Sequence, residues 1–558
     1  MRNFYPKVSK GLIIAVILLG VGFRFVNLDR KGYWHDEVYT TIRAAGFTRY
    51  EIDQELFQNH FVPAPALQKF QQLKSESSSI DTIDSLVTED PQHPPLYFLL
   101  ARFWMQRFGS SILASRFLPA LLSLLSLPLM YQLAMVLFAS QRVALLATML
   151  LALSPLDILF AQTARQYGLL TTAIIGTNWA LLRALRRPTR PAWGWYILGT
   201  TIGLYTHPFF SLTLIAQGIY VLLVIREDPG HEKRQMGQPS DSEENQDKIT
   251  VDEPPLVLTQ SLPEVRPQSF LPFAIAVTIA FGLYTPWLTV LLTNPQGILG
   301  AVGWTSAEVP LHYLTQQWTL NFTALFVNFN GGFDNPWNRL LCPLFVCLIL
   351  SALYAVSRGT VRSTWLFILT ASGVPFLIFV LPDLLLGGKR SAISRYLVAC
   401  YPGIQLAVAY LLAVALARSQ TVGQGLFALT LTGSLVSCSL NALADTSQYQ
   451  ETSYTNPEVL HLLTTQTAIP APIVVSDTGD GDTNIGDLIA LSYALPDNIQ
   501  LFMASRPPDL DVLQNKSTVF VFRPSEQIRE VLTQQGWQLE EVVRFGTLWR
   551  ADSRITQR

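Results

Sequence analysis

The sequence predicts a polytopic α-helical membrane protein, with about eleven transmembrane helices and a small soluble α/β domain at its C-terminal end. Of its 558 residues, 49% are hydrophobic and only 14% are charged. A soluble domain usually carries about 25% charged residues. The apolar residues also occur in long blocks, which excludes a disordered or fibrous chain.

Eleven apolar blocks are predicted to be transmembrane helices, because the hydrocarbon core of a bilayer requires roughly 20 apolar residues in a helix. The first block is expected to be a retained anchor, since no small-residue cleavage site follows it. The predicted spans are Gly11–Val26, Phe117–Phe138, Val143–Phe160, Tyr167–Leu185, Trp193–Thr206, Pro208–Ile225, Phe270–Leu292, Leu340–Ser357, Thr364–Leu381, Tyr396–Ala417 and Gln424–Asn441.

Basic residues in short loops indicate the orientation, because such loops are enriched in Lys and Arg on the cytoplasmic side. Arg2, Lys7 and Lys10 predict a cytoplasmic N-terminus. The segment Pro95–Phe108 is apolar but short and carries two arginines, so we interpret it as an interfacial helix. With that choice, the other basic loops fall on the cytoplasmic side of a plasma membrane: Arg142, Arg183, Arg186, Arg187, Arg190, Arg226, Arg358, Arg362 and Arg418.

Composition divides the chain into a membrane domain, residues 1–441, and an extracytoplasmic α/β domain, residues 442–558. Within the first, residues 28–116 form a long outer loop with interfacial helices, and the polar stretch 226–269 is predicted to be a disordered cytoplasmic linker. The predicted elements of the second are, in order, strand Pro472–Ser476, helix Asn484–Leu495, strands Ile499–Met503 and Thr518–Phe522, helix Glu526–Gln535 and strand Glu540–Phe545.

Several functional classes are excluded at this stage. The net charge of −1 gives no sign of nucleic-acid binding. All four cysteines lie in apolar runs, which argues against a disulfide framework. The phosphate-binding motif GxxxxGK[ST] does not occur, which argues against an ATP-driven pump.

Polar residues gather at the predicted outer ends of the spans. Each group alone is ordinary for a membrane interface, but ionisable residues clustered at membrane depth are costly and usually functional. The five groups are Trp34-His35-Asp36-Glu37; His93-Pro94-Pro95; Gln162, Arg165 and Tyr167; Tyr205-Thr206-His207; and Lys389, Arg390, Arg395 and Tyr396.

The chemistry of these groups suits transfer from a phosphate leaving group. Three cations in the last group depart from the positive-inside trend, and Arg and Lys can hold a lipid phosphate and stabilise its developing charge. The adjacent carboxylates Asp36 and Glu37 can act as a general base toward a hydroxyl, or can bind a divalent cation.

At these residues the chain resembles the GT-C class of membrane glycosyltransferases, in its family 39-like branch of protein O-mannosyltransferases and lipid A aminoarabinose transferases. The resemblance rests on "FRFVNLDRKGYWHDEVYT", "DPQHPPLYFLLARFW", "SRFLPALLSLLSLPLMYQLAMVLF", "LALSPLDILFAQTARQYGLL", "GLYTHPFF" and "SRYLVACYPG", which occur in family order. It implies inverting transfer of a sugar, on the outer face of the membrane, from a polyprenyl-phosphate donor to a glycan, lipid or protein acceptor.

The resemblance also implies roles for individual residues. Asp36 matches the acidic base or acceptor-orienting residue, with Glu37 beside it. Residues that match positions implied to bind the donor or its phosphate are His93, Arg165, Tyr167, His207, Arg395 and Tyr396.

One position departs from the family. Many relatives have Glu where this chain has Thr163, which leaves metal dependence open and makes Asp157 a substitute carboxylate. No cofactor is assigned beyond a divalent cation that Asp36 and Glu37 can bind. Two alternatives stay open: a transporter or flippase of lipid-linked sugars, and a non-catalytic protein of envelope-polysaccharide assembly. Transport would require ionisable residues at mid-span, and the sequence has few.

Overall fold

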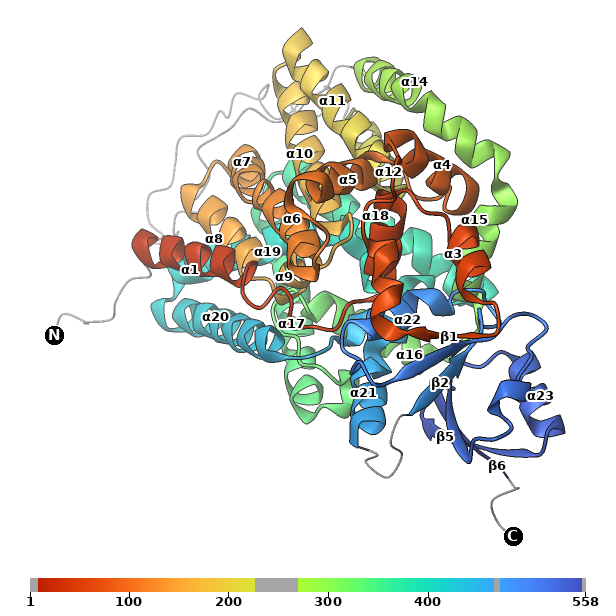
Figure 1. The fold of residues 1–558 in the computed structure, drawn as a ribbon. Coiled ribbons are helices and arrows are strands. Elements are labelled where there is room, and N and C mark those ends of the chain that lie inside the picture. The colour runs from red at the N-terminus through yellow and green to blue at the C-terminus, as the bar shows by residue number, and fades with distance from the viewer. Residues whose placement is uncertain (1–8, 226–268, 466–471, 554–558) are drawn as a thin grey trace, which may run out of the picture.

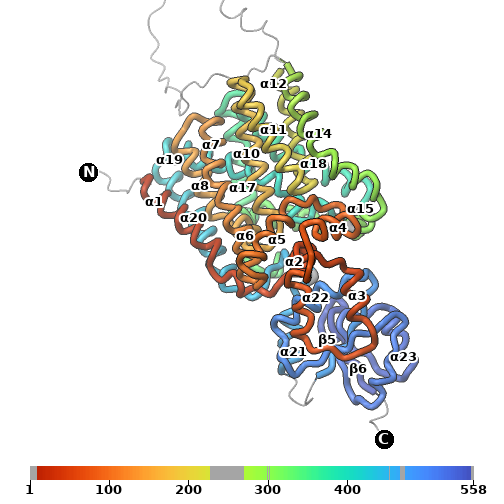
Figure 2. The backbone as a smooth tube through the Cα atoms, turned by 45° about the horizontal axis from the view of Figure 1, so that its top comes forward, coloured from red at the N-terminus to blue at the C-terminus, as the bar shows by residue number. Residues whose placement is uncertain are grey.

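The computed structural model describes residues 9–225, 269–465 and 472–553. It consists of a helical bundle with a β-sheet region at one end (Figures 1 and 2). The bundle helices are α1 (Lys10–Phe23), α6 (Ile112–Leu124), α7 (Ser126–Phe138), α8 (Gln141–Ala152), α9 (Pro155–Ala161), α10 (Tyr167–Arg186), α11 (Arg190–Thr206), α12 (Phe210–Ile225), α14 (Leu271–Thr293), α17 (Pro336–Gly359), α18 (Arg362–Leu386), α19 (Tyr401–Arg418) and α20 (Gln420–Leu443).

Each predicted span coincides with a helix or a pair of consecutive helices. Among the described residues, seven helices are long and apolar enough to cross a membrane, and an eighth span results if the pair α8–α9, bent by 57°, is counted as one. Helices α1 and α12 are apolar but shorter. The chain is therefore a multi-pass membrane protein, and the count of eleven spans stays a prediction. All but one residue of the predicted linker 226–269 lie outside the described residues.

Shorter elements connect the bundle to the sheet. The first loop contains α2 (His35–Ala45), α3 (Arg49–Leu56), β1 (His60–Pro63), η1 (Ala64–Gln71), α4 (Ser79–Glu89) and α5 (Leu96–Phe108). The later connections contain α15 (Pro295–Val302), η2 (Gly303–Ser306), α16 (Leu311–Thr323), η3 (Gly332–Asp334), η4 (Arg390–Ala392), η5 (Ser394–Cys400), η6 (Gln448–Thr455) and α21 (Asn456–Thr465).

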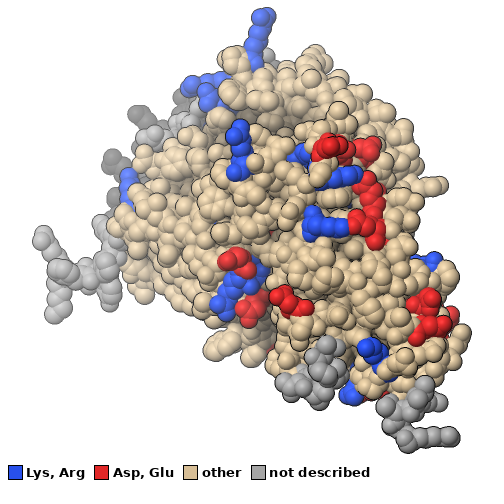
Figure 3. All heavy atoms as spheres, viewed as in Figure 1, with Lys and Arg blue, Asp and Glu red and all other residues tan. Residues whose placement is uncertain are grey.

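Helix α5 is the segment interpreted as an interfacial helix. Its Arg102 is buried and donates hydrogen bonds to the carbonyl oxygens of Ala44 (3.2 Å) and Ser77 (2.6 Å). These hydrogen bonds hold α5 against α2 and against the turn that precedes α4. Figure 3 shows acidic and basic side chains side by side over this region, whereas most of the bundle surface in that view is uncharged.

The C-terminal region folds as a sheet with two helices. Its elements are β2 (Ile473–Ser476), α22 (Asn484–Ser492), β3 (Gln500–Met503), η7 (Asp511–Leu513), β4 (Thr518–Phe522), α23 (Glu526–Gln534), β5 (Trp537–Val543) and β6 (Leu548–Ser553). The strand order is β1-β3-β2-β4-β6-β5, with β2 parallel to β3 and to β4. Strands β2 and β4 are buried almost throughout, as expected for the centre of a sheet.

The first loop and the C-terminal region share one core. Strand β1 pairs antiparallel with β3, so that His60 lies opposite Met503. Val38 and Ile42 of α2 belong to the same buried apolar cluster as Leu488 of α22 and Phe520 of β4. The burial of α2 between the bundle and the sheet fixes the position of the residues at its N-terminus.

Candidate active site

The first turn of α2 carries the two predicted carboxylates, and they have different surroundings. Acidic residues are favourable here because the N-terminus of a helix has a partial positive charge. The side chain of Asp36 is 26% exposed, whereas that of Glu37 is 1% exposed.

Glu37 is enclosed by hydrogen-bond donors. Its two oxygens accept from Arg116, at 2.8 Å from Nε and 2.7 Å from Nη2. They also accept from the backbone N–H of Trp34 at 3.0 Å and that of Ala164 at 2.7 Å. Arg116 in turn donates to the carbonyl oxygen of Leu28. Glu37, together with Arg116, therefore joins α2, α6 and the segment that follows α1. Its carboxylate is fully engaged in these contacts.

Asp36 lies beside Arg165, which follows α9. Its Oδ2 is 3.9 Å from Arg165 Nη2, and Arg165 Nη1 donates to the Asp36 carbonyl oxygen (3.2 Å) and to Thr40 Oγ1 (3.0 Å). Burial raises the pKa of the Asp36 carboxyl, but the guanidinium groups of Arg165 and Arg395 outweigh it and hold that pKa below its ordinary value. Asp36 is therefore a carboxylate at neutral pH.

His93, in the loop between α4 and α5, contacts the same arginine. Arg165 Nη2 lies 3.3 Å from His93 Nε2, so this nitrogen must accept. Burial and the Arg165 charge lower the His93 pKa to about 3, and the ring is neutral at pH 7. A neutral ring that accepts at Nε2 carries its proton on Nδ1, which lies 3.2 Å from the amide nitrogen of Gln166. Because both of these atoms are then donors, the contact is a hydrogen bond only when the Gln166 amide is turned so that its oxygen faces the ring. His93 thus orients Arg165.

His207 and Tyr167 complete this side of the cluster. The His207 ring centroid lies 5.9 Å from that of His93 and 6.3 Å from that of Tyr167. Burial and the nearby His93 and Arg165 lower the pKa of His207 well below its ordinary value. The Phe209 ring connects His207 to Tyr396, at centroid distances of 4.5 and 4.4 Å.

Arg395 lies in η5 and faces the cluster from the other side. Its guanidinium lies over the rings of Trp34 (5.5 Å), Trp304 (5.7 Å) and Tyr396 (5.8 Å). It also forms a two-point ion pair with Glu451 of η6, at 2.7 and 3.2 Å.

The other two predicted cations have different partners. Arg390 pairs with the buried Asp383 at 3.0 Å, and Lys389 lies over the Trp304 ring at 4.9 Å. Of the three cations in this loop, Arg395 is the one that the structure places with Asp36.

A small cavity of about 20 Å³ adjoins Arg395. This volume is enough for about one water molecule. Thr163, the position that departs from the family, lines it together with Trp34, Leu159, Phe160, Tyr167, Ser394, Arg395, Tyr449 and Gln450. Asp157, considered as a substitute carboxylate, is not among them and instead accepts a hydrogen bond from Gln405 at 2.7 Å.

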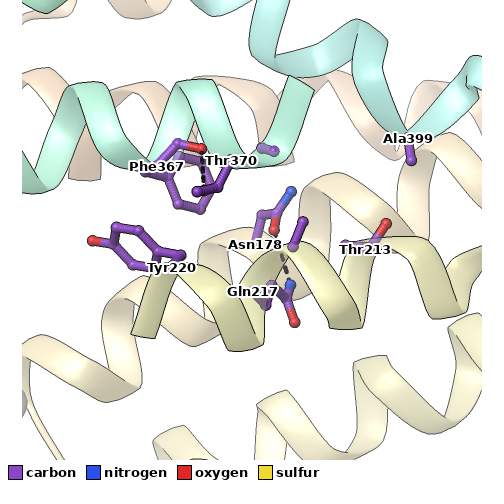
Figure 4. Close-up of a pocket in the computed structure, with 9 residues that line it drawn as sticks. Asn178, Thr213, Gln217, Tyr220, Phe367, Thr370 and Ala399 are labelled. Carbon is purple, nitrogen blue, oxygen red and sulfur yellow. Dashed lines mark hydrogen bonds between the residues drawn. The ribbon is translucent and has the colours of Figure 1, made fainter. Parts of the chain in front are cut away.

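A second cavity, of about 10 Å³, lies within the bundle (Figure 4). Two of its polar side chains pair with each other, since Gln217 donates to Asn178 at 2.9 Å. No charged residue lines it, so it offers no counter-ion to a phosphate. Among the residues that the structure describes, no group of three or more His, Cys, Asp or Glu could hold a metal ion.

The cluster lies at one end of the bundle and the predicted cytoplasmic arginines lie at the other. Tyr167 begins α10 and His207 follows the end of α11, whereas Arg183, Arg186 and Arg190 lie at the opposite ends of the same two helices. Helix α10 spans about 30 Å, which is therefore the approximate distance between Tyr167 and the arginines at its other end.

Sequence reasoning found most of this cluster but missed four residues. Glu451 and Trp304 lie in segments without any motif, and their roles arise only from tertiary contacts. Thr40 and Arg116 had one available signal each, since they belong to the quoted segments "FRFVNLDRKGYWHDEVYT" and "SRFLPALLSLLSLPLMYQLAMVLF".

Comparisons with known proteins identify the fold. Residues 92–231 match the family described as dolichyl-phosphate-mannose-protein mannosyltransferase. Two crystal structures of ArnT from Cupriavidus metallidurans are similar over nearly the whole length. The undecaprenyl phosphate complex has 12% identity, a TM-score of 0.51 and 98% coverage of both chains. The apo state has 13% identity, a TM-score of 0.50 and 97% coverage of both chains. No curated protein sequence matches.

The chain therefore has the fold of ArnT over nearly its whole length, and residues 92–231 resemble the mannosyltransferase family. At the level of the fold, the resemblance that the sequence predicted is confirmed.

Proposed function

We propose that this protein transfers a sugar from a polyprenyl-phosphate-linked donor to an acceptor, at the end of the bundle that bears the sheet. The observation that carries the proposal is the position of the Asp36 carboxylate, whose pKa is lowered by Arg165 and Arg395 together. A carboxylate between two guanidinium groups provides both a base for a hydroxyl and cations for a leaving phosphate.

The proposed roles follow from the contacts. Asp36 orients the acceptor hydroxyl or takes its proton as the sugar moves. Arg395 and Arg165 hold the donor phosphate and stabilise the charge that develops on it. Neutral His93 keeps Arg165 in position through the 3.3 Å contact. Tyr167, His207 and Tyr396 form the aromatic wall beside these groups.

The donor class is supported by the crystal structure of ArnT bound to undecaprenyl phosphate, which shares this fold. The ion pair of Glu37 with Arg116 supports a structural rather than a catalytic role for Glu37. The pairing of Arg390 with Asp383 supports the same conclusion for Arg390, and Lys389 is proposed to attract anionic headgroups to the rim of the site.

The orientation is proposed from the helix ends. The arginines at the far ends of α10 and α11 favour the cytoplasmic side. The site and the C-terminal sheet then lie on the extracytoplasmic side of a plasma membrane, and the N-terminus is cytoplasmic.

The test is transfer of labelled sugar from a polyprenyl-phosphate donor in membranes that contain Asp36→Asn or Arg395→Ala. Loss of a general base typically lowers the rate by about 10²–10⁴-fold, and we expect at least the lower figure for Asp36→Asn. Glu530→Gln, on the exposed face of α23, is the matched control and should retain full transfer. Undiminished transfer in both site variants would overturn the mechanism.

A further inference from the structure

The guanidinium of Arg395 forms an ion pair with Glu451. The proposed function assigns this same guanidinium to the donor phosphate. The two hydrogen bonds, at 2.7 and 3.2 Å, use the fork of the guanidinium. This is the geometry in which arginine also binds a phosphate. A carboxylate and a phosphate therefore compete for the same face of Arg395.

The charge balance of the cluster also indicates that Glu451 and a phosphate exclude each other from Arg395. Arg165 and Arg395 are balanced by the carboxylates of Asp36 and Glu451, so the four groups carry no net charge. A phosphate that entered beside both carboxylates would add uncompensated negative charge at a partly buried site, which is costly. If Glu451 leaves as the phosphate enters, the balance is restored.

Glu451 is held in a way that allows it to leave. Nearby residues before and after it are fixed, since Gln450 donates to the Gly32 carbonyl oxygen at 3.0 Å and Ser453 donates to Asp487 at 2.7 Å. Glu451 itself has φ 42° and ψ −105°, a conformation that residues with a side chain rarely adopt. Its side chain is 37% exposed, and its contact with Arg395 is the one that holds it toward the site.

We infer that Glu451 is an exchangeable counter-ion of Arg395, which the phosphate of the lipid donor displaces and which returns when the lipid product leaves. The inference rests on the proposed function, because that function assigns the phosphate to Arg395. It adds a residue of the C-terminal region, outside residues 92–231, that sets the affinity of the donor site.

The test is equilibrium binding of undecaprenyl phosphate to the purified full-length chain in detergent. Removal of a competing charge-assisted contact should tighten binding in Glu451→Gln by about tenfold. Glu451→Asp keeps the charge but shortens the reach, so a smaller gain is expected. Glu458→Gln removes an exposed carboxylate from the adjacent helix α21 and should bind as the wild type does.

Equal or weaker binding by Glu451→Gln, in a sample that remains monodisperse, would overturn the inference, because it would mean that Glu451 positions Arg395 or is irrelevant to it. If neither the wild type nor the variant binds undecaprenyl phosphate, the proposed donor class is wrong. Inorganic phosphate then decides on Glu451 alone: the inference requires a larger phosphate-induced rise in the melting temperature for Glu451→Gln than for the wild type, and an equal rise contradicts it.

Discussion

Two neighbouring carboxylates in one helical turn have different surroundings here. Asp36 is partly exposed beside two arginines, whereas Glu37 is closed in by Arg116 and two backbone N–H groups. From the sequence the two were equivalent candidates for a base or a metal ligand. The two carboxylates differ in their hydrogen-bonding and charged partners, which come from segments distant in the sequence.

This difference predicts opposite outcomes for two substitutions. Glu37→Ala leaves Arg116 buried without a counter-ion, and breaking such a pair typically costs about 3–5 kcal/mol. We expect Glu37→Ala to lower the thermal midpoint and the yield of folded protein. Asp36→Asn should keep the wild-type midpoint and lose transfer. The measurement is thermal denaturation of both variants in detergent, and an unchanged midpoint for Glu37→Ala would contradict the structural role.

The neutral state of His93 predicts a dependence of stability on pH. The pKa of His93 is about 3 in the folded chain, against an ordinary value of 6.5. Between these values the unfolded chain binds more protons, so the folded state loses stability as the pH falls below 6.5. At pH 5 the loss from this residue is about 2 kcal/mol.

The corresponding measurement is the thermal midpoint from pH 7.5 to pH 5 for the wild type and His93→Gln. The variant should show a smaller drop on acidification. His461→Gln, at an exposed position of α21, is the control and should follow the wild type. Parallel curves for wild type and His93→Gln would show that the ring is not held neutral.

At the scale of elements, helix α2 near the N-terminus is held in place by residues of the C-terminal region. His35 Nδ1 lies 3.2 Å from Asp487 of α22, and Asp487 also lies 3.5 Å from Arg523. The Asp487 charge outweighs the effect of burial and raises the His35 pKa, while His35 and Arg523 lower the Asp487 pKa to about 2. The residue next to Asp36 is therefore fixed by the C-terminal region.

The close contact of α2 with α22 predicts that a methyl group at Gly486 reduces activity. A Cβ at this position would lie 2.7 Å from His35 Nδ1 and 2.8 Å from the Tyr39 ring. Alanine is otherwise the better residue in a helix, so a loss in Gly486→Ala must come from displacement of α2. Transfer should fall while the protein remains folded.

The control for this prediction is Gly481→Ala, where the nearest atom to an added Cβ is Thr483 Oγ1 at 3.7 Å. It should retain transfer. Full activity in Gly486→Ala would show that the first turn of α2 tolerates movement.

For the molecule as a whole, the sequence predicted the helical bundle well and its junction with the sheet poorly. Apolar length is a local property, so every predicted span lies on a helix within a few residues. Strand β1 is a four-residue segment of the first loop that was not predicted, and β6 follows the last predicted strand after a short turn and was also not predicted. Glu451 likewise carries no local signal, because its importance depends on Arg395.

The shared core predicts that the membrane part does not fold well without the sheet. Removal of residues after 441 would expose the apolar residues of α2, η1 and β1 that pack against α22 and β3. A chain that ends at 441 should aggregate in detergent, and its segment 49–71 should be cleaved rapidly by added protease. A chain that ends at 553 is the control. A monodisperse, protease-resistant shorter chain would contradict this expectation.

The pairing of His60 with Met503 also has a consequence for biosynthesis. The ribosome releases the first of these residues long before the second, and at about 5–20 residues per second the delay is tens of seconds. Throughout that interval the nascent first loop lacks its hydrogen-bonding neighbour. Assembly of the end of the bundle that bears the sheet therefore waits until translation has passed β3.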